Sequence, residues 1–315
     1  MLSDFDAGKD KKVLTAIYDM RYSPATFDFG SFLVIAECLR QANDYSEIMV
    51  NILTNEFRAK TNRDIHTPAF EKRWRINNIM EGISRLLPSI TGLNISRKPA
   101  KDVSGMIFPQ DWTAEYKKGL DSPYAPKLIK QLYDLGASPR VFCASEYARS
   151  SINSLYSNNY CTLTLRNSRY QLERNTDLAV WYQFYQYVEA AGYQVVVIPD
   201  QEDLLSGQLY MKYPWQSFDV AAMDLDLRFA LYENSVANFC SSNGPCSLLF
   251  YSDCPVYQFD QLKGKQTDEK FWQPFLGFNV GSNYPWSKAN QIMTWKPSSL
   301  SNLCHYFDLF LSQVD

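Results

Sequence analysis

The 315-residue sequence has few of the residues that hold metal ions, with two histidines, His66 and His305, and seven cysteines among which no CxxC pair occurs. Zinc sites are built mainly from clustered cysteines and histidines, so we expect no metal site. The cysteines are odd in number and widely spaced, which argues against a disulfide framework. They are typical of reduced thiols in a cytoplasmic protein.

Strong charge and long apolar runs are also absent. The formal net charge of -3 gives no long-range attraction to polyanions, so we expect no nucleic-acid partner. The first ten residues are polar rather than an apolar signal core, and no stretch approaches the roughly 18 apolar residues of a membrane span. We therefore expect a cytoplasmic protein. With 46% hydrophobic residues the chain can bury a large core, and its length predicts two domains.

Short apolar runs alternate with amphipathic helices, as in parallel α/β proteins. In the first half we predict strands at 12–19, 47–53 and 92–96 and helices at about 29–39, 70–87 and 126–135. In the second half we predict strands at 160–166, 193–198 and 255–259 and helices at 145–156, 178–191, 225–237 and 298–313.

Turn residues at 136–139 separate the two series. The predicted fold class is thus α/β, with two Rossmann-like domains facing each other across a cleft. A first domain would span 1–138, a second 139–297, and a closing helix 298–315.

The loop after strand 160–166 is the strongest candidate site, because parallel sheets bind ligands at the carboxyl ends of their strands. Guanidinium groups offer a planar fork of donors that suits phosphate, and the N-terminus of the next helix would add N–H groups. A diphosphate would fit there, and a charged loop with local salt bridges is the alternative. The candidate residues are Arg166, Arg169, Arg174 and Asn175.

A second cluster is the small-residue turn of Ser242, Asn243, Gly244 and Pro245, whose glycine permits close approach to an anion. An ordinary turn is the alternative. We place Arg228 and Glu233 on one face of helix 225–237, from which they would reach a nucleotide or sugar unless they are solvated charges.

An acidic triplet and an aromatic segment each suggest a binding site, but a structural role is the preferred interpretation of both. The triplet at 224–226 imitates a metal-binding DxD, but its place at a helix start favours capping. The aromatic residues of 272–295 can stack on sugars or bases, although core packing is the preferred interpretation.

Carboxylates also follow the first predicted strand, where one can act as general base in group transfer to an alcohol. We favour Asp28 and place Asp19 second, with Arg21 and Thr26 on the acceptor side. A helix N-terminal role for Asp28 and a structural hydrogen bond for Asp19 remain alternatives.

Four segments carry a resemblance that runs through nearly the whole chain: YDMRYSPATFDFGSFLVIAE, TLRNSRYQLERNTD, LRFALYENSVANFCSSNGP and GFNVGSNYPWSKANQIMTW. Together they resemble a group of bacterial proteins that look like GT-B glycosyltransferases. The order of arginine loop, helix and Asn-Gly-Pro turn is also similar to the donor domains of heptosyltransferases and fucosyltransferases. The resemblance implies that Arg166, Arg174, Asn243 and Gly244 hold a nucleotide diphosphate. It also implies that 1–138 is an acceptor-side domain and 139–297 a nucleotide-sugar-binding domain.

The function implied is that of a metal-independent glycosyltransferase in bacterial surface polysaccharide synthesis. Its partners would be a nucleotide-sugar donor and a glycan or lipid-linked acceptor, with no separate cofactor and with peripheral association with membrane assembly machinery. Two alternatives stay open: a non-catalytic nucleotide- or glycan-binding scaffold on the same fold, and a nucleotide-sugar epimerase.

Overall fold

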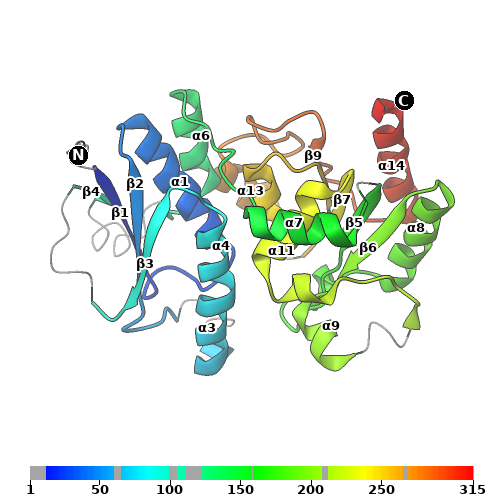
Figure 1. Cartoon of the computed structure of the whole chain (residues 1–315), viewed down its shortest axis with the longest axis horizontal. Coiled ribbons are helices and arrows are strands. Elements are labelled where there is room, and N and C mark those ends of the chain that lie inside the picture. The colour runs from blue at the N-terminus through cyan, green and yellow to red at the C-terminus, as the bar shows by residue number, and fades with distance from the viewer. Residues whose placement is uncertain are drawn as a thin grey trace, which may run out of the picture.

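The protein has an α/β fold with two separate parallel sheets, one in the N-terminal half of the chain (up to residue 138) and one in the C-terminal half (Figure 1). The computed structural model describes residues 12–59, 65–98, 105–110, 122–157, 159–207, 212–264 and 269–314. The polar start at 1–10 lies outside the described residues. No helix in the described ranges has the length and apolar character needed to cross a bilayer.

The sheet of the N-terminal half has the strand order β3-β2-β1-β4, with all neighbours parallel. Its strands are β1 (Val13–Asp19), β2 (Glu47–Leu53), β3 (Ile90–Ser96) and β4 (Met106–Phe108). The accompanying helices are α1 (Asp28–Ala42), α3 (Ala69–Arg75), the π-helical turn η1 (Ile76–Met80), α4 (Glu81–Arg85) and α6 (Pro126–Asp134). The three strands and three helical segments predicted here are confirmed, and β4 was not predicted.

The sheet of the C-terminal half is also parallel, in the order β6-β5-β7-β8-β9. Its strands are β5 (Tyr160–Thr164), β6 (Gln194–Ile198), β7 (Ala237–Ser241), β8 (Val256–Phe259) and β9 (Gln291–Met293). The longer helices are α7 (Glu146–Leu155), α8 (Leu178–Ala190), α9 (Gln201–Ser206), α11 (Leu225–Asn234), α13 (Glu269–Leu276) and α14 (Leu300–Val314). Shorter turns are η2 (Leu172–Arg174), η3 (Asp219–Ala222), α12 (Gly244–Ser247) and η4 (Leu248–Tyr251).

One prediction in this half was wrong: the helix at 225–237 ends at Asn234, and the residues after it form β7. The sequence ANFCS contains no β-branched residue and has a polar residue at its second position, so its pattern does not predict a buried strand. Asn238 is nevertheless buried, because its amide donates to Tyr232 O at 3.0 Å and Pro255 O at 2.7 Å and accepts from Thr162 Oγ1 at 2.6 Å. Tertiary hydrogen bonds therefore stabilise this strand.

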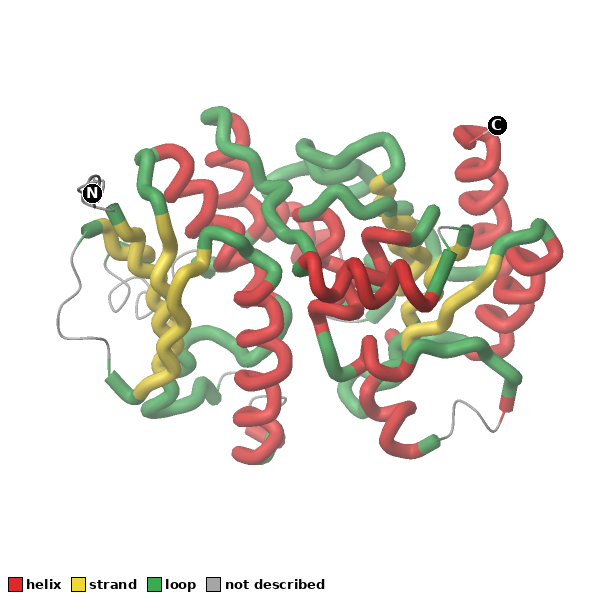
Figure 2. Tube along the Cα trace, viewed as in Figure 1, coloured by secondary structure: helices red, strands yellow, loops and turns green. Residues whose placement is uncertain are grey.

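The closing helix α14 packs against α8 on the outer side of the second sheet (Figure 2). Its stripe of Leu303, Phe307 and Phe310 is buried, which confirms the core-facing interpretation of this helix. It lies at the far end of the molecule from the first sheet.

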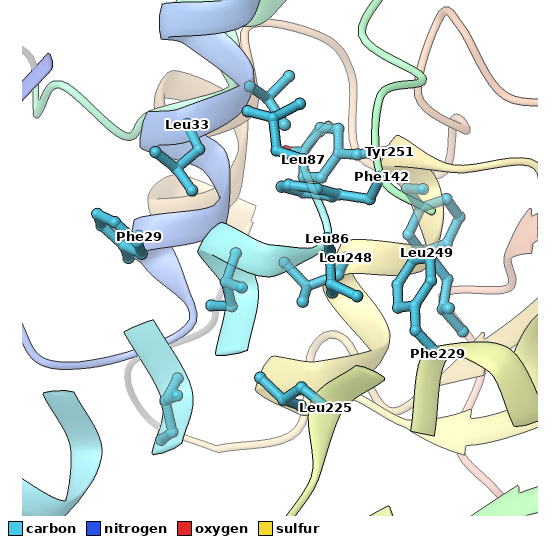
Figure 3. Packing of buried hydrophobic residues seen from close by; sticks show 14 of the residues in the cluster. Phe29, Leu33, Leu86, Leu87, Phe142, Leu225, Phe229, Leu248, Leu249 and Tyr251 are labelled. Atoms are coloured by element: carbon cyan, nitrogen blue, oxygen red, sulfur yellow. The ribbon is translucent and has the colours of Figure 1, made fainter. Parts of the chain in front are cut away.

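A single hydrophobic cluster joins the two halves. It contains Phe29 and Leu33 of α1 together with Phe229 of α11 and Leu248 and Tyr251 of η4 (Figure 3). Further contacts between the halves are made by α4 with α11 and by α6 with α13. The two sheets are therefore held together by buried apolar side chains and not by the connecting chain alone.

Two glycines permit this close approach. A Cβ on Gly244 would lie 2.3 Å from Cδ2 and 3.0 Å from Cβ of Phe27, and a Cβ on Gly30 would lie 2.3 Å from Cδ2 of Leu248. Leu248 can move the end of its side chain, whereas the ring of Phe27 is held close to the backbone. Gly244 is therefore the stricter requirement.

We expect Gly244→Ala to lower the free energy of unfolding by about 1–3 kcal/mol, because an added methyl in a tight contact forces a rearrangement. Gly92→Ala is a matched control, since its new methyl would meet only the end of the Met49 side chain. Urea denaturation of both variants measures the difference. Equal stabilities would show that the contact between Phe27 and Gly244 is not tight.

Candidate functional site

A cavity of about 1410 Å³ lies between the two halves and is lined by residues of both. Its wall includes the segments that follow β1, β5, β7 and β8, so it lies at the carboxyl ends of the strands. In the second sheet β5 and β7 are neighbours. From β5 the chain goes on to β6 at one edge of the sheet, and from β7 it goes on to β8 in the opposite direction. Such a switch point opens a crevice between neighbouring strand ends, where ligands of α/β proteins bind.

Arg166 follows β5 and organises the loop after it. Its Nη1 donates to Gln171 O at 3.2 Å and to Asn175 Oδ1, and its Nη2 donates to Tyr170 O at 2.7 Å. All these acceptors are neutral. Burial lowers the pKa of Arg166 from its usual value, and the carboxylates of Asp200, Glu173 and Glu202 oppose this shift. The guanidinium thus brings positive charge to the cavity wall while it fixes the shape of the loop.

Arg174 connects this loop to the small-residue turn. Its Nη2 donates to Ser242 O at 2.8 Å and to Ser242 Oγ at 3.1 Å, and both residues line the cavity. The two segments that the sequence singled out therefore meet at one wall. Asn175, which we expected to bind the ligand, does not line the cavity, and its Oδ1 also accepts from Ser168 N at 3.0 Å within the loop.

The N-terminus of α8 does not contribute to the cavity as expected. The carboxylate of Asp177 caps it by accepting from Ala179 N at 3.0 Å and Val180 N at 3.3 Å. These N–H groups are therefore occupied, and neither Asp177 nor Leu178 lines the cavity.

The turn after β7 presents an unpaired donor. Asn243 Oδ1 caps the single-turn helix α12 by accepting from Cys246 N at 3.0 Å, while its Nδ2 is buried without a hydrogen-bond partner among the described residues. Ser242, Asn243, Gly244 and Pro245 all line the cavity.

Arg228 of α11 is the least compensated cation of this wall. It is only 6% exposed, and no hydrogen bond or ion pair from the described residues reaches its guanidinium, whose Nε is buried. It also lines the cavity. Burial raises the pKa of the neighbouring Tyr232, and the positive charge of Arg228 opposes that shift. A cation whose Nε is buried without a partner from the described residues is costly, and this is the arrangement expected where an anionic ligand binds.

Glu233 does not join Arg228, which corrects our placement of both residues on one helical face. Positions five apart on an α-helix are rotated by roughly 140°, so Glu233 points elsewhere. Its carboxylate accepts from Arg149 Nε at 2.7 Å and from Ala144 N at 2.9 Å, in a smaller hollow outside the main cavity. The triplet at the start of the same helix caps it, since Asp224 Oδ1 accepts from Asp226 N at 2.9 Å and Leu227 N at 3.0 Å.

Arg169 lies at the rim and is neutralised by carboxylates. It forms an ion pair with Glu71 of α3 and a weaker one with Glu202 at 3.7 Å. The first pair connects the two halves of the chain across the edge of the cavity. Arg169 is therefore less available to a ligand than Arg228.

From the N-terminal half of the chain, Asp28 and Thr26 line the cavity, whereas Asp19 and Arg21 do not. Thr26 Oγ1 donates to Asp28 Oδ2 at 2.7 Å, which orients the carboxylate. Asp19 is fully buried. Its Oδ1 accepts from Arg21 N at 2.9 Å, and its Oδ2 accepts from Arg21 Nε at 2.9 Å. The structural interpretation of Asp19 is the one that this geometry favours.

The sequence did not single out several residues that line the cavity, among them Ser31 and Arg58 of the N-terminal half and Gln258, Gln261 and Tyr251 of the C-terminal half. The position of Gln261 directly after β8 was an available signal. Within the described part of the chain, no group of three or more His, Cys, Asp or Glu side chains is arranged to hold a metal ion.

Comparisons with protein-family models and with curated proteins find no match. Among solved structures, the chain is similar to the glycosyl transferase family 9 protein of Veillonella parvula, with 12% identity, a TM-score of 0.58, and coverage of 97% of this chain and 99% of that chain. ADP-heptose LPS heptosyltransferase II of E. coli matches with 11% identity and a TM-score of 0.48, over 96% of this chain and 100% of that chain. The first similarity shows a shared fold. The expected likeness to fucosyltransferases stays a prediction.

If Arg228 is held without a partner for the sake of a ligand, its removal should not destabilise the ligand-free protein. We expect Arg228→Met to raise the free energy of unfolding by about 1 kcal/mol or more, because it removes an unpaired buried charge and keeps the side-chain length. Arg85→Met on the exposed face of α4 is the control, with an expected change within about 0.5 kcal/mol. A clear loss of stability in Arg228→Met, measured by urea denaturation, would assign Arg228 a structural role.

Proposed function

We propose that this protein is a glycosyltransferase of the GT-B type, with two Rossmann-like domains and the cavity as the cleft between them. The donor is a nucleotide-sugar whose diphosphate binds at the wall formed by Arg166, Arg174, Arg228 and the turn at 242–245. The observation that supports this most is Arg228, a buried cation that no described residue pairs with, at a strand-end crevice. The fold shared with a glycosyl transferase supports the same class.

The charges of the wall suit the chemistry of this reaction. Transfer of the sugar leaves a nucleoside diphosphate, and donors that are already aligned stabilise the charge that develops on it. Arg228 supplies an uncompensated guanidinium, and Asn243 supplies an amide N–H without a partner. In the proposal these groups take the part that a divalent cation plays in other transferases, and no separate cofactor is needed.

Asp28 is the proposed general base. It lines the cavity from the N-terminal half, and one of its oxygens accepts a hydrogen bond from Thr26. The other oxygen, Oδ1, is left to accept the proton of the attacking acceptor hydroxyl. The acceptor, a glycan or lipid-linked saccharide, would enter on this side, and a role in bacterial surface polysaccharide synthesis at the cytoplasmic side of the membrane fits such an acceptor.

Donor binding is tested first with UDP, GDP, ADP and CMP in thermal-shift measurements, since a ligand specific to the folded state raises its apparent stability. We expect one nucleotide to stabilise the protein, and Arg228→Met to weaken its binding about 10- to 100-fold, as expected for a lost charge-assisted hydrogen bond. Arg85→Met should bind normally. Binding and turnover should persist in EDTA. A protein stabilised by none of the nucleotides would favour the scaffold alternative.

The base is tested by sugar transfer from a panel of nucleotide-sugars. We expect Asp28→Asn to lower kcat about 10²- to 10⁴-fold with little change in donor affinity, because only proton abstraction is lost. Asp44→Asn, at an exposed turn, is the matched control. Full turnover in Asp28→Asn would remove this residue from the mechanism, and conversion of the donor sugar without transfer would indicate an epimerase.

A further inference from the structure

The cavity contains a second group of unpaired polar side chains, on and just after β8. Gln261 is 2% exposed, and its Nε2 is buried without a hydrogen-bond partner among the described residues. Gln258 is also buried, and in the described ranges no hydrogen bond reaches its side-chain amide. Both residues line the cavity. Because buried amides are nearly always hydrogen-bonded, the buried Nε2 of Gln261 indicates a ligand that supplies the missing partner, and the cavity-lining amide of Gln258 is available to the same ligand.

As far as the structure describes it, the surrounding wall is uncharged and partly aromatic. Met293 pairs with Gln258 across β8 and β9, and the indole of Trp272 donates to Gln261 O at 2.9 Å. Tyr284 also lines this part of the cavity. The carboxylate of Asp260, next to Gln261 in sequence, is turned to Ser298, whose N and Oγ donate to it at 3.0 and 2.6 Å. We call Gln258, Gln261, Trp272, Tyr284 and Met293 the amide subsite.

On one side the amide subsite adjoins the proposed diphosphate site. The loop that follows Gln261 packs on the arginine loop, since Lys263 Nζ donates to Asn175 O at 3.2 Å. A Cβ on Gly264 would lie 3.3 Å from Cγ of Arg174. A group bound to Gln261 is therefore next to the arginine-bearing wall.

On the other side the amide subsite continues toward the proposed base. The rings of Tyr284 and Tyr251 are 6.0 Å apart, and the Tyr251 hydroxyl lies 3.3 Å from Ser31 Oγ on α1, in the same helical turn as Asp28. The subsite is thus connected to the proposed diphosphate site on one side and, through Tyr251 and Ser31, to the helical turn of Asp28 on the other. In a transfer reaction this is the place of the group that moves.

We infer that the amide subsite holds the donor's sugar, that this sugar is uncharged, and that Gln261 is a specificity-determining residue. This inference rests on the proposed function. An amide both donates and accepts hydrogen bonds, as sugar hydroxyls do, and aromatic faces pack on the apolar face of a sugar ring. A carboxylate on the sugar would find no cation within the subsite.

The test compares Gln261→Leu with Gln186→Leu, a matched change at an exposed position of α8. Calorimetry measures Kd for UDP, GDP and ADP, for their glucose conjugates, and for UDP-glucuronate. We expect Gln261→Leu to leave the Kd of the nucleoside diphosphates unchanged and to weaken the glucose conjugates about 3- to 10-fold, as for a lost neutral hydrogen bond. The ligand-free variant should melt no earlier than the wild type, because it loses an unpaired buried donor.

Each contrary result has its own meaning. Equal weakening of nucleoside diphosphate and glucose conjugate would place the nucleoside, rather than the sugar, at Gln261 and overturn the inference. Unchanged affinities with a lower melting temperature would make Gln261 structural and overturn it too. Tighter binding of UDP-glucuronate than of UDP-glucose by the wild type would overturn the inference that the sugar is uncharged. A wild type that binds none of the seven ligands would overturn the proposed function itself, and this inference with it.

Discussion

The close packing of α1 against the turn after β7 is the constraint on which the cavity depends. Phe27 lies over Gly244, and Leu248 lies over Gly30, so the start of α1 touches the small-residue turn of the C-terminal half. Asp28 and Asn243 each adjoin one of these contacts, and both line the cavity. Because the interface is a continuous hydrophobic cluster, the distance between the proposed base and the anion-binding wall is set by core packing.

Much of the fold could be predicted from the sequence, because β1, β2, β5 and β6 are apolar runs between amphipathic helices. The strands that escaped prediction lack that signal. β4 and β9 are three residues long, and β7 carries Asn238, whose burial depends on partners contributed by other segments. Local propensity cannot report such partners.

The sequence predicted where the candidate site lies, but not which of its arginines are available to a ligand. The rule that ligands bind at the carboxyl ends of strands located the loop after β5 and the turn after β7. It could not order the arginines, because pairing decides their availability: Arg169 is neutralised by Glu71, which lies 98 residues away in sequence. Arg228 and Glu233 looked equivalent on one helix. In the structure Glu233 pairs with Arg149, whereas Arg228 has no partner in the part of the chain that the structure describes.

The unpaired groups also divide the cavity into two chemical zones. Arg228 Nε and Asn243 Nδ2 are hydrogen-bond donors, so a ligand beside them must supply acceptors, and the positive charge of Arg228 favours an anion. Around Gln258 and Gln261 the missing partner is polar but the wall is neutral. A ligand that satisfies both zones at once has an anionic part joined to an uncharged, hydroxyl-bearing part. A diphosphate alone would leave the amides unsatisfied, and a free sugar would leave the guanidinium unsatisfied, so the cavity fits the two joined in one molecule better than either by itself.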